Sequence, residues 1–85
     1  MGNCIDIQVF NSLGEPCELV NVHVFIHGLG LISGGSIDEY TDSDGHVSIE
    51  THHDYEPSRE FTINVRGQIF GPYEIGGGDF TVQLE

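Results

Sequence analysis

Residues 20–27, Val-Asn-Val-His-Val-Phe-Ile-His, indicate the fold class of this 85-residue chain. Every second position is apolar and β-branched: Val20, Val22, Val24 and Ile26. Because successive side chains of a β-strand point to opposite faces, this alternation predicts a strand with one face on an apolar core and the other facing water. An amphipathic helix would instead repeat its apolar residues every three or four positions.

The same alternation of apolar and polar residues recurs along the rest of the chain. It is clear in residues 5–9, 46–51, 60–66 and 79–85, and two weaker segments at 36–41 and 69–75 complete a set of about seven strands. Turn-forming residues separate these segments at 11–16, 42–45, 67–68 and 76–78, and we expect 67–68 and 76–78 each to close a hairpin. No stretch carries helical apolar spacing, so residues 1–85 are predicted to form a single all-β domain without substantial helix.

The two cysteines, Cys4 and Cys17, match no zinc-binding spacing. If the first two strands pair as a hairpin about residues 11–16, Cys17 lies near Phe10 and Cys4 faces Val22. The two sulfur atoms are then too far apart to form a disulfide, because bonded cysteines need Cα atoms within about 7 Å of each other. We therefore expect two free, partly buried thiols, which favours a reducing compartment.

The charge of the chain excludes several classes of function. Two arginines and no lysine oppose fourteen acidic residues, which gives a formal net charge of −12. Nucleic acids and anionic membranes are bound through clustered lysine and arginine, so neither is an expected partner. The chain also has no apolar run of about 20 residues and no signal-peptide pattern at Met1–Asp6. A protein partner, by contrast, is expected to carry a basic surface.

Three segments of the sequence resemble the transthyretin-like β-sandwich family, in particular its carboxypeptidase regulatory-like type. Val9–Pro16, with the strand that follows at 20–26, is similar to the family's opening of strand, Gly-x-Pro turn and strand. Tyr40–Ile49 is similar to its hairpin motif, and Phe61–Gly67 to the next strand and glycine. The resemblance implies a Greek-key β-sandwich of about seven strands in two sheets.

The enzymes among the relatives carry features that this sequence lacks. Transthyretin-like hydrolases of hydroxyisourate have a histidine in the first strand, an arginine, and a Tyr-Arg-Gly-Ser tail, whereas here these positions read Cys4–Ile7 and Val82–Glu85. The lysine–asparagine cross-link of collagen-adhesin sandwiches is also excluded, since the chain has no lysine. We therefore expect a protein that is not an enzyme.

The Asp42-Ser43-Asp44-Gly45 turn is a candidate calcium site, with Asp42 and Asp44 as the ligands. Eight of the fourteen acidic residues lie between positions 38 and 60 around it. An EF-hand is excluded, because with Gly45 at position six of the loop neither position one nor position twelve is a carboxylate. The alternative is an ordinary turn in which the aspartate side chains bond their own backbone. We expect no cofactor, and calcium at this turn is the alternative.

A glycine-rich loop at residues 28–35 carries three aliphatic side chains, Leu29, Leu31 and Ile32. If exposed, they form a small apolar tip on an acidic body, which is typical of a partner-binding site. Phe25 and Phe70, on otherwise polar strand faces, would extend this tip or lie at a subunit contact. The alternative is that the loop folds back and closes the end of the sandwich.

These observations favour a non-enzymatic binding, adaptor or accessory module that presents loops and an acidic surface to a protein partner. The resemblance points to two settings, namely adaptor domains of bacterial secretion systems and accessory domains of secreted hydrolases. The alternative from another class is a calcium- or carbohydrate-binding accessory domain of a secreted protein. A small hydrolase of the transthyretin-related type has the least support.

Overall fold

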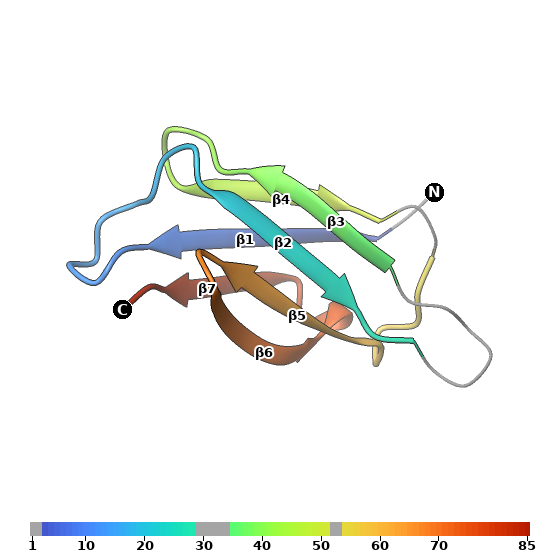
Figure 1. Ribbon diagram of the computed structural model, residues 1–85. Coiled ribbons are helices and arrows are strands. Elements are labelled where there is room, and N and C mark those ends of the chain that lie inside the picture. The colour runs from blue at the N-terminus through green and yellow to red at the C-terminus, as the bar shows by residue number, and fades with distance from the viewer. Residues whose placement is uncertain (1–2, 29–34, 52–53) are drawn as a thin grey trace.

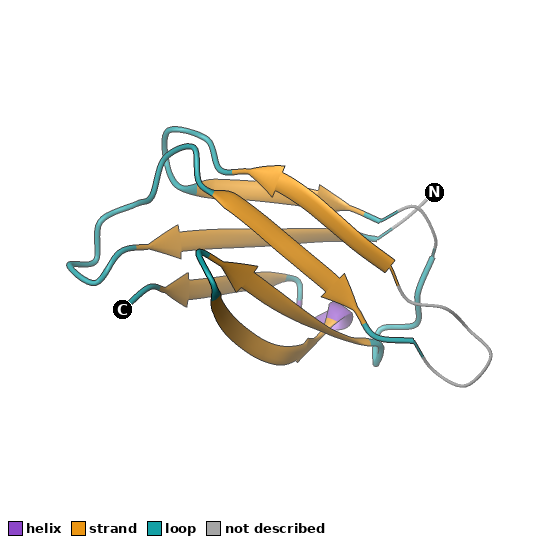
Figure 2. Cartoon of the chain, viewed as in Figure 1, coloured by secondary structure: helices purple, strands orange, loops and turns teal. Residues whose placement is uncertain are grey.

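The computed structural model describes residues 3–28, 35–51 and 54–85, which form an all-β structure (Figures 1 and 2). The described residues contain seven strands: β1 (Cys4–Phe10), β2 (Asn21–Ile26), β3 (Gly35–Tyr40), β4 (His46–Glu50), β5 (Glu60–Val65), β6 (Gln68–Glu74) and β7 (Asp79–Gln83). The two weaker segments of the sequence are thus confirmed as strands β3 and β6. A short 3-10 helix, η1 (Ile75–Gly77), precedes β7. The described part of the chain has no helix of the length and apolarity needed to cross a membrane.

The strands form two sheets that face each other. One sheet has three strands in the order β4-β1-β7, and the other has four in the order β3-β2-β5-β6. β1 pairs with β7 in parallel, whereas the other pairings are antiparallel. The first and last strands of the chain are therefore neighbours, and β2 lies in the sheet opposite β1 (Figure 1).

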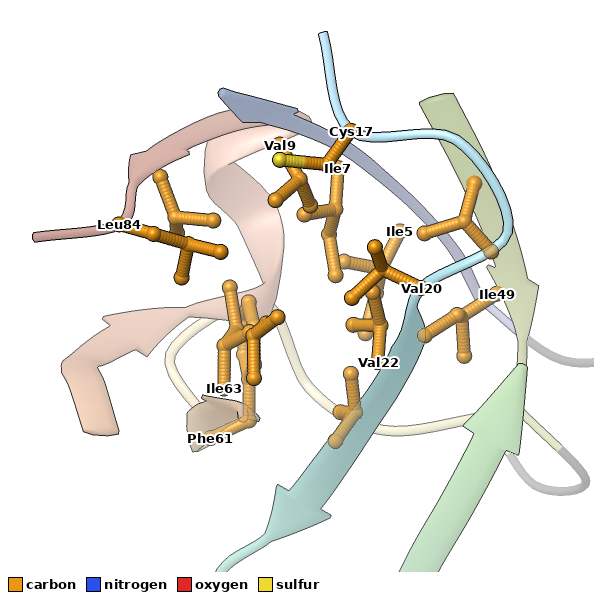
Figure 3. Close-up of a cluster of buried hydrophobic side chains, with 14 of the residues drawn as sticks. Ile5, Ile7, Val9, Cys17, Val20, Val22, Ile49, Phe61, Ile63 and Leu84 are labelled. Carbon is orange, nitrogen blue, oxygen red and sulfur yellow. The ribbon is translucent and has the colours of Figure 1, made fainter. Parts of the chain in front are cut away.

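The core lies between the two sheets and is built from the alternating apolar positions. In β2, Val22 and Val24 are fully buried, while Asn21 before them and Phe25 after them are exposed. Figure 3 shows the buried side chains of both sheets meeting, among them Ile5, Ile7, Val9, Ile49, Phe61 and Ile63. Each such side chain contributes about 1.5–3 kcal/mol when it is fully removed from water, so this layer supplies most of the stability that the fold has.

The hairpin expected between the first two strands does not form, because β1 and β2 belong to different sheets. The connection between them is tied to one sheet at each end. The Cys17 amide donates to the Val9 carbonyl of β1, whereas the Val20 amide donates to the side chain of Thr41, which follows β3. A period-two pattern indicates which face of a strand is buried but not which strand is its neighbour. The pattern therefore did not reveal that the chain crosses from one sheet to the other between β1 and β2.

The outcome at the two other expected hairpins differs. The hairpin at residues 67–68 is confirmed, with the turn itself at Arg66-Gly67 between β5 and β6. Both turn residues have positive φ angles, 52° and 82°, as a two-residue type I′ turn requires. The prediction of a hairpin at residues 76–78 is wrong, because β6 and β7 lie in different sheets. Here a Cβ atom on Gly76 would come within 2.7 Å of Pro57, so this glycine permits a close packing contact during the crossing.

Both cysteines are free, as expected from the sequence. Cys4 is exposed and stands opposite Glu50 of β4, not opposite Val22 as the hairpin would have placed it. Its Sγ lies 2.9 Å from the Ser48 Oγ. Cys17 is buried in the core, so the two thiols have different surroundings.

Candidate interaction surface

The Asp42–Gly45 turn, where the sequence suggests a calcium site, is held together by the Asp42 side chain. Asp42 Oδ1 accepts hydrogen bonds from the backbone amides of His46 (3.1 Å) and Asp44 (2.8 Å). These bonds, the one from His46 foremost, lower the pKa of the Asp42 carboxyl, because they favour its ionised form. The side chain therefore stabilises the turn, which is what the alternative interpretation of the motif expected.

One carboxylate oxygen of the same turn is engaged by the backbone. Asp42 Oδ1 already accepts two hydrogen bonds, which occupies both of its lone pairs. Among residues 3–28, 35–51 and 54–85, no group of three histidine, cysteine, aspartate or glutamate side chains is arranged to hold a metal ion. Calcium binding at Asp42 and Asp44 remains a prediction that rests on the sequence.

The residues predicted to bind a partner fall into two groups. Leu29, Leu31 and Ile32 lie outside the described residues. Phe25 is described and lies in β2, where its side chain is 50% exposed on the solvent side of the four-stranded sheet. Its ring centre lies 5.6 Å from that of His27.

Two further large apolar side chains share this side of the sheet with Phe25. Residues opposite each other on paired strands point to the same face. Tyr40 stands opposite Asn21 of β2 and is 65% exposed, while Ile69 stands opposite Asn64 of β5 and is 70% exposed. We call the surface formed by Phe25, Tyr40 and Ile69, with the polar residues between them, the outer sheet face.

The centre of the outer sheet face is polar. The strand register places four side chains in one row across the sheet: Asp38, His23, Asn64 and Ile69. The His23 Nδ1 and the Asp38 Oδ1 lie 2.8 Å apart, which fixes both side chains. Exposed aromatic side chains together with hydrogen-bonding groups are also found in non-obligate protein interfaces.

Sequence reasoning missed Ile69 and placed Phe70 wrongly. Phe70 packs against the core instead of extending a polar face, and its neighbour Ile69 faces solvent. The pairing of β5 with β6 is irregular between Phe61 and Ile63, and the buried Ile63 stands opposite Phe70. When two adjacent residues of a strand are both apolar, the sequence does not indicate which of them faces the core. The pairing with the neighbouring strand decides it.

Positive charge is scarce on the surface because one of the two arginines is buried. The Arg59 side chain is 3% exposed; its Nε donates to Glu56 over 2.8 Å, and its Nη1 donates to the His27 carbonyl over 3.1 Å. The pKa of Glu56 is lowered by its own backbone amide and then by Arg59. Arg66, in the turn between β5 and β6, is thus the exposed arginine of the chain.

No protein-family model matches this chain, and no curated protein sequence matches it.

Proposed function

We propose that this protein is a non-enzymatic binding module that engages a protein partner through the outer sheet face. The observation that carries the proposal is the exposure of Phe25, Tyr40 and Ile69 on the same face of the four-stranded sheet. These side chains share one face of the sheet, and aromatic side chains are enriched at protein interfaces. The paired His23 and Asp38 between them supply hydrogen-bonding groups that are already held in place.

The partner in this proposal carries a basic surface. The chain has a net charge of −12 and a single exposed arginine, so a basic protein is attracted over long distances and an acidic one is repelled. The association rate should therefore fall as salt is added, whereas the contacts of Phe25, Tyr40 and Ile69 should be less sensitive to salt.

The proposal includes the transthyretin-like Greek-key sandwich as the fold. Two facing sheets with the orders β4-β1-β7 and β3-β2-β5-β6 support it. This architecture carries many unrelated functions, so the surface rather than the fold supports a binding role. An adaptor of a bacterial secretion system and an accessory domain of a secreted hydrolase are the two settings that we propose for it.

A photo-crosslinking experiment tests the role of the outer sheet face. A photoreactive amino acid is placed at Tyr40, and in a matched control at Leu13, which is 82% exposed in the loop after β1. Crosslinked proteins are identified from the cell of origin, and their affinities are then measured with purified variants. We expect a basic protein at position 40 but not at position 13. Phe25→Ala should weaken its binding at least about fivefold, as truncation of a large aromatic interface residue does.

Two results would contradict the proposal. One is a partner that binds the Phe25→Ala, Tyr40→Ala and Ile69→Ala variants as tightly as it binds the native chain. The other is a calcium-dependent rise in Tm that Asp42→Asn and Asp44→Asn abolish, because a ligand that binds the folded state must raise Tm. The second result would favour the calcium-binding alternative.

A further inference from the structure

The two sheets have four edge strands, and three of them are protected against pairing with another chain. β3 and β4 lie against each other on one side of the structure (Figure 1). β6 contains Pro72, which has no N–H to donate, and its pairing with β5 is irregular. Proline and irregular pairing are both devices that keep sheet edges from associating.

The fourth edge strand, β7, has neither a proline nor an irregular pairing, and it contacts the neighbouring edge strand β6 through the rings of Phe80 and Tyr73. Its register with β1 is unbroken over five residue pairs, from Asp6 with Asp79 to Phe10 with Gln83. Within residues 3–28, 35–51 and 54–85, β1 is the one strand with which it pairs. β7 also contains no proline and no glycine, so every backbone group along it can take part in a ladder.

The hydrogen bonds at the ends of the ladder show which groups of β7 remain free. The Asp6 amide donates to the Gly78 carbonyl, and the Leu84 amide donates to the Phe10 carbonyl. Because a parallel ladder uses alternate residues of each strand, Phe80 and Val82 direct their backbone groups toward β1. The backbone groups of Asp79, Thr81 and Gln83 point the other way, and those three residues are exposed.

The charges beside this edge favour a basic neighbour. Asp79 stands directly opposite Asp6 in the ladder, so their two carboxylates are neighbours on the solvent face of the sheet. Like charges placed opposite each other destabilise a sheet. Asp6 has His46 at 3.3 Å, with its Nε2 facing the carboxylate, whereas Asp79 has no ion-pair partner among the described residues. A lysine or arginine on a further strand would lie next to Asp79 and relieve the repulsion.

The inward side of the same edge is aromatic. Phe80 is half-buried, and its ring centre lies 5.0 Å from that of Phe61 and 5.2 Å from that of Tyr73. Tyr73 is likewise partly buried against the core. An apolar side chain on a further strand would cover the exposed parts of these rings between the two sheets, where burial of apolar area is favourable.

We propose that the free edge of β7 binds an extended segment of a partner protein in which basic and apolar residues alternate. The segment pairs with the backbone of Asp79, Thr81 and Gln83, places its basic side chains beside Asp79, and places its apolar side chains against Phe80. Such strand addition derives its affinity from main-chain hydrogen bonds and its specificity from alternate side chains. A second copy of this chain is a poor occupant, because two chains of charge −12 repel each other.

This site is separate from the outer sheet face, since β7 belongs to the three-stranded sheet. The two proposals therefore stand or fall independently. A partner that binds at Phe25 leaves the amides of β7 unchanged, and a segment that binds at β7 is insensitive to Phe25→Ala.

The probe for the test is a synthetic seven-residue peptide of alternating lysine and valine. Two control peptides are an alternating glutamate–valine peptide and a peptide with the lysines and valines in blocks. Amide hydrogen exchange of the isotope-labelled chain is followed by NMR. At a peptide concentration ten times the Kd, exchange at Asp79, Thr81 and Gln83 should slow about tenfold. The exposed loop residue Ser12 serves as an internal reference and should not change.

Variants at the edge separate strand pairing from general attraction. Thr81→Pro removes an outward N–H that the ladder with β1 does not use, so it should reduce peptide affinity at least about tenfold. Thr81→Val keeps the N–H and should bind as the native chain does. Asp79→Asn tests the charge without altering the backbone, and should weaken binding about two- to fivefold.

Several results would overturn the proposal. One is that the peptide does not slow exchange at Asp79, Thr81 and Gln83. Another is that either control peptide binds as tightly as the alternating lysine–valine peptide. The third is that a folded Thr81→Pro variant binds the peptide with native affinity. If Thr81→Pro does not fold, a synthetic chain with an N-methylated Thr81 amide takes its place in the test, because N-methylation removes the same amide hydrogen. Self-association of the chain through β7, seen by sedimentation without peptide, would show a second copy to be the occupant instead.

Discussion

Replacing Gly45 by alanine should destabilise the protein through a specific contact between the Asp42–Gly45 turn and the β1–β2 connection. Gly45 has a φ angle of +75°, and an added Cβ would lie 2.8 Å from the Val9 carbonyl oxygen and 2.9 Å from the Cys17 amide nitrogen. These two atoms are hydrogen-bonded to each other, and the Val9 amide donates to the Gly45 carbonyl. The neighbours are therefore held in backbone bonds and cannot move away without breaking them.

The expected magnitude has two parts. The left-handed backbone conformation costs alanine about 1–2 kcal/mol, of which about 0.4–1 kcal/mol is offset because alanine also restricts the unfolded chain. The close contacts with backbone atoms add about 1–3 kcal/mol, as for other overpacked sites. We therefore expect Gly45→Ala to reduce the free energy of unfolding by about 1–5 kcal/mol.

Gly67→Ala is the matched control. Gly67 has a similar φ angle of +82°, but an added Cβ there would have no atom within 4 Å. The two variants share the conformational cost and the effect on the unfolded state, so their difference isolates the contact. Urea unfolding followed by circular dichroism gives both free energies, and Tm should differ by about 4–8 °C for each kcal/mol. Equal destabilisation by the two variants would refute the argument from packing.

Two other predictions concern charged side chains. Arg59→Ala should lower the free energy of unfolding by about 2–4 kcal/mol, because it leaves a cavity and removes the hydrogen bond to the His27 carbonyl. Arg59→Met should recover at least about 1 kcal/mol by filling the space. Equal free energies of unfolding for the two variants in urea would mean that packing of the side chain is unimportant. Asp42→Ala should lower Tm at pH 7. The pKa of Asp42 is lowered in the folded state, so the stabilisation is complete above the unfolded pKa of about 4 and is lost as the pH falls through the folded pKa. The Tm difference between native chain and variant should therefore shrink toward pH 3. A difference that is constant with pH would contradict the role of the two amides.

The strands and the turns around Asp42 and Gly67 were predictable because they depend on local chemistry. Alternation of apolar residues is a property of one strand, and a turn needs only the residues within it. The neighbours of each strand were not predictable in the same way. The crossing between β1 and β2 depends on which carbonyl Cys17 meets, and the crossing after Ile75 depends on the fit of Gly76 against Pro57. Both are contacts between residues distant in the sequence.

The candidate site was predictable to the same limited degree. Phe25 stands out because an aromatic residue breaks the polar half of an alternating strand. Tyr40 and Ile69 became candidates only when the register placed them on the face of Phe25. Ile69 in particular owes its exposure to the irregular pairing opposite Phe61 and Ile63, for which the sequence carries no simple signal. The unprotected edge of β7 is visible only in the sheet order.

The parallel pairing of β1 with β7 also bears on how the protein folds during synthesis. Asp6 and Asp79 pair across almost the whole chain, so the three-stranded sheet is complete only after the last strand has been made. Long-range contacts of this kind slow folding, because the loop must close before the contact forms. Until then β1 has one open edge, which is a site at which incomplete chains can aggregate. A net charge of −12 opposes association of such incomplete chains, which gives the acidic composition a role before the sheet is complete.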